Sequence, residues 1–594
     1  MDDVAQTIHA YDPSSEVRDA VEHWLAAFET ALAARDKARI ASLFHENCHW
    51  RDILAFTWDF SSARGCDDIA AGLAAGQADM KAHDFHLPEG RKPPRHVRRV
   101  GRDCIEAIFE FTTGIGGGDG IIRLSPANDG LKVWHLSTAL EEIAGHPERI
   151  GANRPTGDAY SRNFGGKNWL DVRRAAVAYE DREPTVLVIG GAQAGLAIAA
   201  RLNALGIDNL VVERWPRIGD SWRKRYHSLA LHNSIHLNHL PYLHFPPTFP
   251  TYVPKDMLGN WFEFYADAME INCWTDTEFV GGGWDETSKT WTARLKRGDG
   301  SERVVRPKHL VFANGVSSYP YVPDIPGLAD FKGEVIHSEG FETGANWAGK
   351  RAFIIGTGSS ANDIALDLHS FGVKTTLIQR GSTTVVSIDP SARLNEAVWD
   401  EGPPLEDCDL IVSSTTPALM VEGYRMATKV MLELDKEMIG GLKRIGFKFD
   451  VGEDETGHQM KYFRRGGGYN LDAGSSELMI RGELGLLHYE TIERFTAEGA
   501  LLKDGTTVPA DLIVLATGYY GQSELVRRAL GEEMVERIGP VWGLGDDGEL
   551  NNMFRRTPQE NLWFIAGALP HVRINSKYLA LQIMATDLGL LGPR

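Results

Sequence analysis

Two segments of the chain share one pattern, and this repetition limits the fold more than any other feature. Val186–Leu202 reads VLVIGGAQAGLAIAARL and Ala352–Leu368 reads AFIIGTGSSANDIALDL. Each begins with a short, β-branched apolar run, which is typical of a buried parallel strand. A glycine-rich turn then leads into an Ala/Leu-rich helical pattern. Strand, tight turn and helix N-terminus in this order form a cradle for a pyrophosphate. The sequence therefore predicts two dinucleotide-binding units.

The turns supply small residues where the backbone must approach a pyrophosphate closely. The predicted contacts in the first turn are Gly190, Gly191, Ala192 and Gly195. The predicted contacts in the second turn are Gly356, Gly358, Ser359 and Ser360. Both copies depart from the full glycine pattern, but the residues that replace glycine are small and keep the steric requirement intact.

The residue at the end of the second strand of each unit indicates which dinucleotide is bound. In the first unit this residue is Glu213, whose carboxylate accepts hydrogen bonds from ribose hydroxyls and repels a phosphate. The first unit therefore suits FAD. In the second unit Gln379 and Arg380 occupy this place, and a guanidinium pairs with a 2′-phosphate, which suits NADPH. The alternative, two structural units without a ligand, is the less favoured interpretation.

Composition excludes several other classes of protein. The chain has 594 residues, enough for three or four domains, and a formal net charge of −19, which argues against a nucleic-acid partner. Its five cysteines are scattered without a C-x-x-C, so a disulfide framework, a zinc ribbon and a dithiol redox centre are disfavoured. The acidic, polar N-terminus and the absence of a long apolar run predict a cytoplasmic protein without a membrane anchor.

The region before the first dinucleotide unit has its own pattern. Residues 1–16 read as a loose tail, and residues 17–147 combine helical and alternating strand-like periodicity, which predicts an α+β domain. A Pro/Gly/Asn/Arg-rich stretch at 148–183 is expected to be a linker.

The α+β block resembles the NTF2-like (SnoaL-like) cone fold. The resemblance rests on the first long helices, the segment LFHENCHWRDILAFTWDF, and the helix start at Gly65–Ile69. Some members of that family are enzymes with an acid/base Asp or His in the cone, which makes His49, Arg51 and Asp52 candidates. The alternative, that these residues pack or contact another domain, is favoured.

A motif between the two units indicates the chemistry. Phe331–Phe341 reads FKGEVIHSEGF and matches F-x-G-x-x-x-H-x-x-x-(Y/F). The chain thus resembles the class B flavoprotein monooxygenases, in particular the flavin-containing monooxygenase and YUCCA-like branch. Further family signatures follow in the expected order: IGDSW at Ile218–Trp222, LPYLHFPPTFP at Leu240–Pro250, YVPDIPG at Tyr321–Gly327 and LATGY at Leu515–Tyr519.

The resemblance implies a fold of two Rossmann-like α/β domains after the NTF2-like α+β domain. The FAD-binding domain is expected at 184–326 and 510–594, and the NADPH-binding domain at 327–509. A helix-rich insertion at about 395–441 is expected to cover the active site or to form a subunit contact. A homo-oligomer, such as a dimer, is expected because NTF2-like domains commonly associate.

The resemblance also implies a reaction and further site residues. NADPH reduces FAD, the reduced flavin captures O2 as a C4a-hydroperoxide, and one oxygen atom passes to a small organic substrate. Further FAD contacts are expected from Gly219, Trp222, Thr517, Gly518 and Gln582. The fingerprint residue His337 is often considered catalytic, but a role in locking the interdomain linker is favoured.

A histidine-rich stretch, YHSLALHNSIHLNHLPYLHF, is expected to form a loop over the flavin. Here His232 or Asn233 is expected to hydrogen-bond the hydroperoxide. A metal site is the less favoured interpretation, because no Cys or carboxylate lies at ligand spacing within the stretch.

Departures from the family pattern leave the substrate open. Baeyer–Villiger members end the fingerprint with Trp, where this chain has Phe341, and carry Tyr-Pro-Gly where it has Tyr226-His227-Ser228. N- or S-oxygenation is therefore the leading expectation. A YUCCA-like oxidative decarboxylase or a Baeyer–Villiger oxygenase is the alternative with the same cofactors. A non-oxygenating flavin redox sensor or ligand-binding protein is the alternative from another class.

Overall fold

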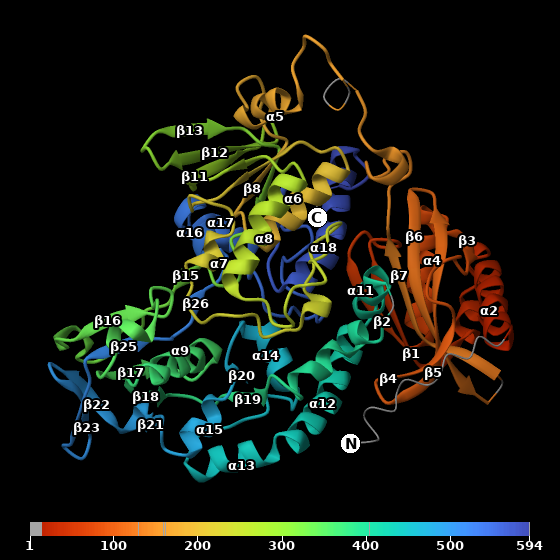
Figure 1. Cartoon of the computed structure of the whole chain (residues 1–594). Coiled ribbons are helices and arrows are strands. Elements are labelled where there is room, and N and C mark those ends of the chain that lie inside the picture. Colours follow the sequence, from red (N-terminus) through yellow and green to blue (C-terminus); the bar gives the residue numbers. More distant parts are fainter. Residues whose placement is uncertain (1–14, 129, 158–159, 161, 403, 593–594) are drawn as a thin grey trace.

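A computed structural model of the protein describes residues 15–128, 130–157, 160, 162–402 and 404–592. The chain forms an N-terminal α+β block beside two α/β units, each built on its own parallel sheet. Helices inserted between two strands of the second unit's sheet extend back to the N-terminal block (Figure 1). Of the predicted tail at 1–16, residues 1–14 lie outside the described residues.

Within its described residues, the N-terminal block packs three helices against a curved mixed sheet. The helices are α2 (Ser15–Ala33), α3 (Lys37–Ser42) and α4 (Cys66–Met80). The strands, in spatial order, are β2 (Phe60–Arg64), β1 (Phe44–Ile53), β7 (Gly130–Leu140), β6 (Gly116–Ala127), β5 (Arg102–Thr113) and β3 (His83–His86), with β4 (Arg95–Arg99) also paired to β5. Strands β1 and β7 are parallel, and the other pairs are antiparallel. The predicted α+β character is confirmed, whereas membership of the NTF2-like family stays a prediction.

The first α/β unit has a five-stranded parallel sheet. Its strands, in spatial order, are β10 (Cys273–Trp274), β9 (Asn209–Val212), β8 (Val186–Ile189), β14 (His309–Phe312) and β27 (Leu562–Phe564). Helix α6 (Gln193–Ala204) connects β8 to β9, as the first quoted segment predicts. All four residues of β8 are buried, because the sheet is covered on both faces. The remaining elements of this unit are α7 (Asp220–Arg223), α8 (Lys255–Ala268), β11 (Thr277–Asp285), β12 (Thr290–Arg297), β13 (Glu302–Val305), α16 (Ser523–Leu530), α17 (Glu532–Ile538) and α18 (Leu569–Asp587).

The second α/β unit repeats this design. Its parallel strands, in spatial order, are β16 (Glu334–His337), β25 (Leu512–Leu515), β17 (Arg351–Ile355), β18 (Lys374–Gln379) and β21 (Gly485–His488). Helix α9 (Ser359–Ser370) follows β17. A small antiparallel sheet of β22 (Ile492–Thr496), β23 (Gly499–Leu502) and β24 (Thr507–Pro509) precedes β25.

One predicted domain boundary is wrong. The sequence suggested that the FAD-binding domain resumes at 510, but β25 pairs with β16 and β17 inside the second sheet. The chain returns to the first unit only after Ala516, whose backbone N–H still bonds to Ile355 of β17. The sequence of a four-residue apolar strand does not indicate which of two sheets the strand joins, because that choice depends on long-range packing.

The predicted insertion is helical and contacts the N-terminal block. Its helices are α10 (Ala397–Asp400), α11 (Leu405–Ser413), α12 (Pro417–Leu434) and α13 (Lys436–Arg444), followed by α14 (Gly457–Arg465) and α15 (Ser475–Ile480). Two short strands on either side of helices α10–α14 in the chain, β19 (Thr384–Ser387) and β20 (Tyr469–Asp472), pair in parallel. In Figure 1, α11 lies between the sheet of the N-terminal block and α18.

The segment expected to be a linker is docked at its C-terminal end. It contains α5 (Trp169–Ala178), and Tyr179 directly after that helix is buried. The Tyr179 hydroxyl donates to the carbonyl of Asn209 at 2.7 Å, and the Trp274 indole donates to the carbonyl of Val177 at 2.7 Å. These bonds fix the end of the segment against the first sheet.

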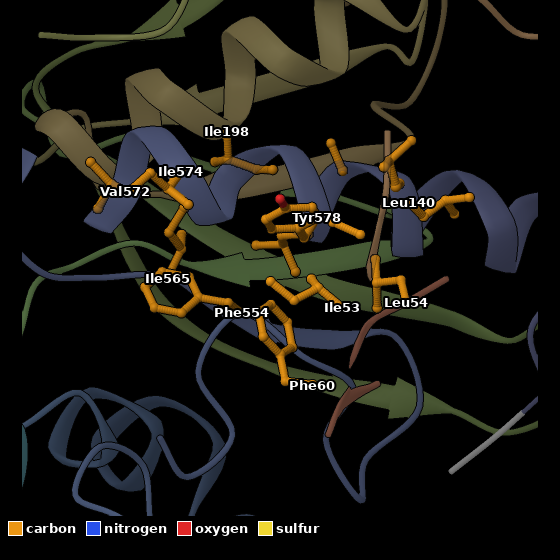
Figure 2. Close-up of a cluster of buried hydrophobic side chains, with 14 of the residues drawn as sticks. Ile53, Leu54, Phe60, Leu140, Ile198, Phe554, Ile565, Val572, Ile574 and Tyr578 are labelled. Carbon is orange, nitrogen blue, oxygen red and sulfur yellow. The ribbon is translucent and has the colours of Figure 1, made fainter. Parts of the chain in front are cut away.

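A continuous apolar core joins the N-terminal block to the first α/β unit. Figure 2 shows Ile53, Leu54 and Phe60 of the block facing Tyr578 on α18, with Ile198 of α6 on the other side of that helix. The rings of Phe60 and Tyr578 meet edge to face, with 6.0 Å between centroids. Burial of this kind stabilises by roughly 1.5–3 kcal/mol per large side chain. The block is therefore part of the folded body of the chain.

A buried ion cluster forms a second contact of the block. The carboxylate of Glu106 is 2% exposed and accepts from Arg95, Arg99 and Arg123 at 2.8–3.1 Å. Arg95 and Arg99 also donate to Glu401 of the insertion at 2.6–3.2 Å. Burial alone would raise the pKa of Glu106, but the surrounding guanidinium groups hold that pKa well below its usual range.

We predict that Glu106→Gln destabilises the protein, because it leaves buried guanidinium groups without their carboxylate. Breaking a buried ion pair costs about 3–5 kcal/mol at neutral pH. Since folding lowers the pKa of Glu106, its contribution is complete above pH 4.5 and is lost as the pH falls below that value. Calorimetric unfolding at several pH values should show the variant and the wild type converging in acid.

Glu110→Gln is the matched control, because Glu110 lies on the same strand and its side chain is 40% exposed. We expect a change within about 0.5 kcal/mol for this variant. Equal unfolding temperatures for Glu106→Gln and the wild type at neutral pH would show that the cluster does not stabilise the fold.

Candidate active site

A cavity of about 890 Å³ opens at the carboxyl ends of the first sheet. Ile189, Val212 and Ala313, which lie at or just after the ends of β8, β9 and β14, contribute to its lining. Ligands of doubly wound α/β folds bind at this edge. Four residues predicted to bind FAD line the cavity: Gly190, Ala192, Glu213 and Trp222.

The first glycine turn is closed too tightly for larger residues. The Gly190 N–H donates to the carbonyl of Val212 at 2.9 Å. A Cβ built on Gly195 would lie 1.8 Å from the Gly190 carbonyl oxygen, so only glycine fits at 195. The spacing predicted from the sequence therefore has a direct steric cause.

Glu213 stabilises this turn as well as lining the cavity. Its Oε2 accepts from the Gly191 N–H at 2.7 Å and its Oε1 from the Trp215 N–H at 2.9 Å. Burial raises the pKa of Glu213, and these two backbone donors oppose the rise. Each carboxylate oxygen keeps a further lone pair, so the side chain can still accept from a ribose hydroxyl.

Three polar atoms at the cavity lack a partner among the described residues: Ser221 Oγ, Arg225 Nε and the Tyr519 hydroxyl. An unsatisfied buried polar atom costs about 1–3 kcal/mol. A ligand with phosphate, hydroxyl and ring acceptors would satisfy them, so the residues fit FAD. Ser221 and Tyr519 belong to the motifs IGDSW and LATGY but are not among the residues predicted to bind FAD, and nothing in the sequence distinguishes Arg225.

Trp222 connects two sides of the cavity. Its indole N–H donates to Gln193 Oε1 at 3.1 Å, and Gln193 Nε2 donates to the Gly567 carbonyl at 3.3 Å. All three residues line the cavity. The chain segment before α18 is thereby held against the start of α6.

Two residues predicted to bind FAD have other roles in the structure. Gly219 is absent from the cavity lining, and a Cβ built on it would lie 2.2 Å from the Gly259 carbonyl oxygen, so it permits close packing of α7 on α8. Gln582 is fully buried and bonds to the backbone of Phe554, Tyr578 and Arg556. Gln582 is absent from the cavity lining, so its predicted contact with FAD gains no support from this geometry and stays a prediction.

The predicted residues His337, Thr517 and Gly518 meet at the hinge between the α/β units. The hinge contains the two-stranded ribbon β15 (Tyr319–Pro320) and β26 (Tyr519–Tyr520). His337 Nε2 donates to the Gly518 carbonyl at 3.1 Å, and Thr517 Oγ1 donates to the Tyr321 carbonyl at 2.5 Å. Burial lowers the pKa of His337, which favours a neutral ring at this contact.

The second glycine turn has the predicted form. Gly356 has φ of +127°, and a Cβ there would lie 2.4 Å from the Ala516 carbonyl oxygen. Gly358 is the N-cap of α9, whose first residues are Ser359 and Ser360. Arg380 is exposed directly after β18, whereas the neighbouring Gln379 is fully buried and bonded to the backbone of Lys448. Arg380 is thus the residue of the pair that can reach a ligand.

His232 and Asn233 contact the second unit and its insertion. His232 Nε2 lies 3.2 Å from Asp363 Oδ2, which also accepts from the Tyr226 hydroxyl at 2.5 Å. Burial would lower the pKa of His232, but Asp363 raises it above its ordinary value. Asn233 Nδ2 donates to Glu396 Oε1 at 3.0 Å. Neither His232 nor Asn233 is among the residues that line the 890 Å³ cavity.

The polar residues considered in the N-terminal block are used within the fold. Arg51 donates to the Thr415 carbonyl and to Glu549, both outside the block. Asp52 is fully buried and accepts from Phe56, Thr57 and Thr138. Arg51 therefore contacts residues of another domain, which is the interpretation favoured from the sequence.

No cluster of three His, Cys, Asp or Glu side chains in the described ranges is placed to hold a metal ion. In the same ranges no helix is long and apolar enough to cross a membrane.

Comparison with known proteins identifies relatives of the two α/β units. Residues 185–531 match the family described as flavin-binding monooxygenase-like. The chain is 29% identical over 352 residues to indole-3-pyruvate monooxygenase YUCCA1 of Oryza sativa subsp. japonica, a match that covers 59% of this chain and 80% of the relative. It is 30% identical over 380 residues to probable indole-3-pyruvate monooxygenase YUCCA9 of Arabidopsis thaliana, covering 64% and 81%.

Among solved structures, a variant of cyclohexanone monooxygenase from Rhodococcus sp. Phi1 bound to NADP+ is similar in fold. The TM-score is 0.51 at 20% identity, and the match covers 68% of this chain and 87% of that one.

We predict that Gly195→Ala abolishes flavin retention, because the added Cβ collides with the Gly190 carbonyl and opens the turn. The measurement is flavin absorbance per mole of purified protein. Gly283→Ala is the control, since a Cβ at this position of β11 meets no atom within 4 Å. Full flavin content in Gly195→Ala would contradict the assignment of this turn.

Proposed function

The chain belongs to the flavin-binding monooxygenase-like family, and from this premise we propose that it oxygenates a nitrogen or sulfur atom of a small organic molecule. The protein is an NADPH-dependent flavin monooxygenase with FAD and NADPH as cofactors. The observation that carries the assignment is the 890 Å³ cavity, with its unpartnered polar atoms, at the ligand-binding edge of the first sheet. Bound FAD, once reduced by NADPH, supplies the activation of O2.

The first α/β unit would bind and orient FAD. The turn at Gly190–Gly195 and the N-terminus of α6 offer backbone donors to a pyrophosphate, and Glu213 offers an acceptor to the ribose. Ser221 Oγ, Arg225 Nε and the Tyr519 hydroxyl would gain their missing partners from the bound cofactor.

The second unit would bind NADPH at the N-terminus of α9. Gly358, Ser359 and Ser360 begin that helix, where backbone N–H groups favour a pyrophosphate. The exposed guanidinium of Arg380 is suited to a 2′-phosphate, since it carries a permanent charge and a planar set of donors.

His337, His232 and Asn233 would act as positioning residues. His337 ties the hinge through the Gly518 carbonyl, and His232 ties the first unit to Asp363 in the N-terminal half of α9. Asn233 ties the same loop to Glu396. Together these bonds would set how the two cofactor sites face each other and exclude water between them, which limits loss of the activated oxygen as H2O2.

A second candidate is oxygenation of a carbonyl compound, either a 2-oxo acid or a ketone. The curated relatives in plants are indole-3-pyruvate monooxygenases, and this observation favours the candidate.

We further propose that the N-terminal block has the NTF2-like cone fold, because three helices pack against its curved mixed sheet.

Incorporation of isotopic oxygen tests the function directly. The purified protein is incubated with NADPH, 18O2 and a panel of amines, sulfides, 2-oxo acids and ketones, and products are analysed by mass spectrometry. Labelled N-oxides or S-oxides support the leading proposal, and labelled esters or decarboxylated acids support the second candidate. NADPH oxidation that yields only H2O2 with every substrate would contradict both.

We predict that Arg380→Ala raises KM for NADPH about 10- to 100-fold and leaves KM for NADH nearly unchanged. A hydrogen bond to a charged group contributes about 1.5–3 kcal/mol, which corresponds to this range. Lys374→Ala, at the opposite end of β18, is the control and should leave both constants unchanged. An equal increase in KM for NADPH and for NADH in Arg380→Ala would show that Arg380 does not recognise the 2′-phosphate.

A further inference from the structure

Helix α11 is fixed at both ends by the N-terminal block. In its first turn, Asp407 is 2% exposed and accepts from Arg91 Nε at 2.9 Å and from the Lys92 N–H at 3.0 Å. Just after its last residue, the Ser414 carbonyl accepts from His135 Nε2 at 2.9 Å. Arg91, Lys92 and His135 all belong to the N-terminal block, so the block determines where α11 lies.

The middle of α11 is bonded to α18 of the first α/β unit. Asp409 forms a bidentate pair with Arg573, with Nε–Oδ2 and Nη2–Oδ1 distances of 2.7 Å each. The Trp399 indole donates to Asp409 Oδ1 at 3.0 Å and fixes the carboxylate from the insertion side. A bidentate arginine–carboxylate pair restricts orientation as well as distance.

Arg573 also holds the loop that carries His232 and Asn233. The Arg573 side chain is 4% exposed, and its Nη1 donates to the carbonyls of Leu237 and His239 at 2.5 and 2.9 Å. One guanidinium therefore joins three segments: α11, α18 and the 232–239 loop. The Gly567 carbonyl, which lies just before α18, bonds to Gln193 at the FAD cavity.

We propose that Asp409 and Arg573 are positioning residues through which the N-terminal block holds the 232–239 loop and the start of α18, which follows the cavity residue Gly567. The inference rests on the proposed function in one respect: the loop lies outside the cavity lining and acts on oxygen transfer by tying the first unit to Asp363 and Glu396, which sets how the two cofactor units face each other. Without the Asp409 carboxylate the guanidinium loses its orientation, and the loop carbonyls lose a fixed donor. The loop then opens the site to water, and activated oxygen leaves as H2O2.

The test is Asp409→Asn in the full chain, which keeps the side-chain size and removes the charge. We expect flavin content to be retained and H2O2 released per NADPH to increase. We also expect kcat/KM for oxygenation to fall roughly 10- to 100-fold, since a misplacement of about 1 Å costs up to about 100-fold in rate. Amide hydrogen exchange over residues 235–239 should accelerate, and this readout does not depend on activity.

Two further variants make the test specific. Asp511→Asn is the matched control, because it breaks a bidentate arginine pair with Arg351 in the second sheet, away from α11. It should leave coupling and loop exchange unchanged. Arg573→Lys keeps the positive charge but cannot form the planar bidentate pair, so we expect intermediate increases in H2O2 release and loop exchange. This variant decides the test if Asp409→Asn fails to fold.

A double-mutant cycle tests the connection to the N-terminal block. Asp407→Asn weakens the contact of α11 with the block and should also raise H2O2 release. If both residues act through α11, the double variant should resemble Asp409→Asn alone rather than the sum. Additive effects, or unchanged loop exchange and coupling in Asp409→Asn and Arg573→Lys, would overturn the inference. Absence of 18O incorporation by the wild type would instead refute the proposed function, while the exchange measurement would still decide the positioning role.

Discussion

The burial of helix α18 on all its faces is the constraint on which the rest of the architecture depends. Fourteen of its 19 residues are buried, with Leu569 and Ala585 near the two ends of the buried run. The buried run is mainly apolar and so needs cover on every side, and its polar members Arg573 and Gln582 are bonded to segments packed against the helix. Helix α6 and the first sheet cover one side, and the ends of β1, β2 and β7 cover another (Figure 2). The first α/β unit of this chain is therefore completed by the N-terminal block.

Charged contacts determine how the N-terminal block is oriented at its apolar contact with the first α/β unit. A buried ion pair contributes little net stability over apolar side chains of the same shape, but it tolerates only one arrangement of its members. Glu106 and Glu401 share Arg95 and Arg99, and Arg555 of the first unit pairs with Asp59 of the block at 2.9 and 3.0 Å. Apolar burial holds the block against the α/β units, and these pairs fix its orientation relative to the insertion and the first unit.

The sequence predicted local features well and long-range pairings poorly. The two glycine turns, Glu213 and the exposed Arg380 follow from residues within about 25 positions of each other, because a βαβ unit determines its own geometry. The place of β25 and the role of Gln582 depend on neighbours far away in the chain. The roles of Asp409 and Arg573 were also unpredictable, since 164 positions separate the two residues and neither belongs to a motif. Such contacts are set by how the units pack.

The geometry of the N-terminal block favours a mechanical role over a catalytic one. The Asp52 carboxylate, one of the acid/base candidates, accepts from four donors: the N–H groups of Phe56 and Thr57 and the hydroxyls of Thr57 and Thr138. Burial raises the pKa of Asp52 to about 6 despite these donors. Burial and nearby arginines lower the pKa of His49 to about 4, so this ring is neutral at physiological pH. The rings of Phe85 and Phe111 stack inside the block, with 5.1 Å between centroids. Among the polar groups that reach out of the block, Arg51 and Arg91 bond to the insertion, at the Thr415 carbonyl and Asp407. An added domain of this kind can change the reaction by setting the position of α11, without contributing a reacting group of its own.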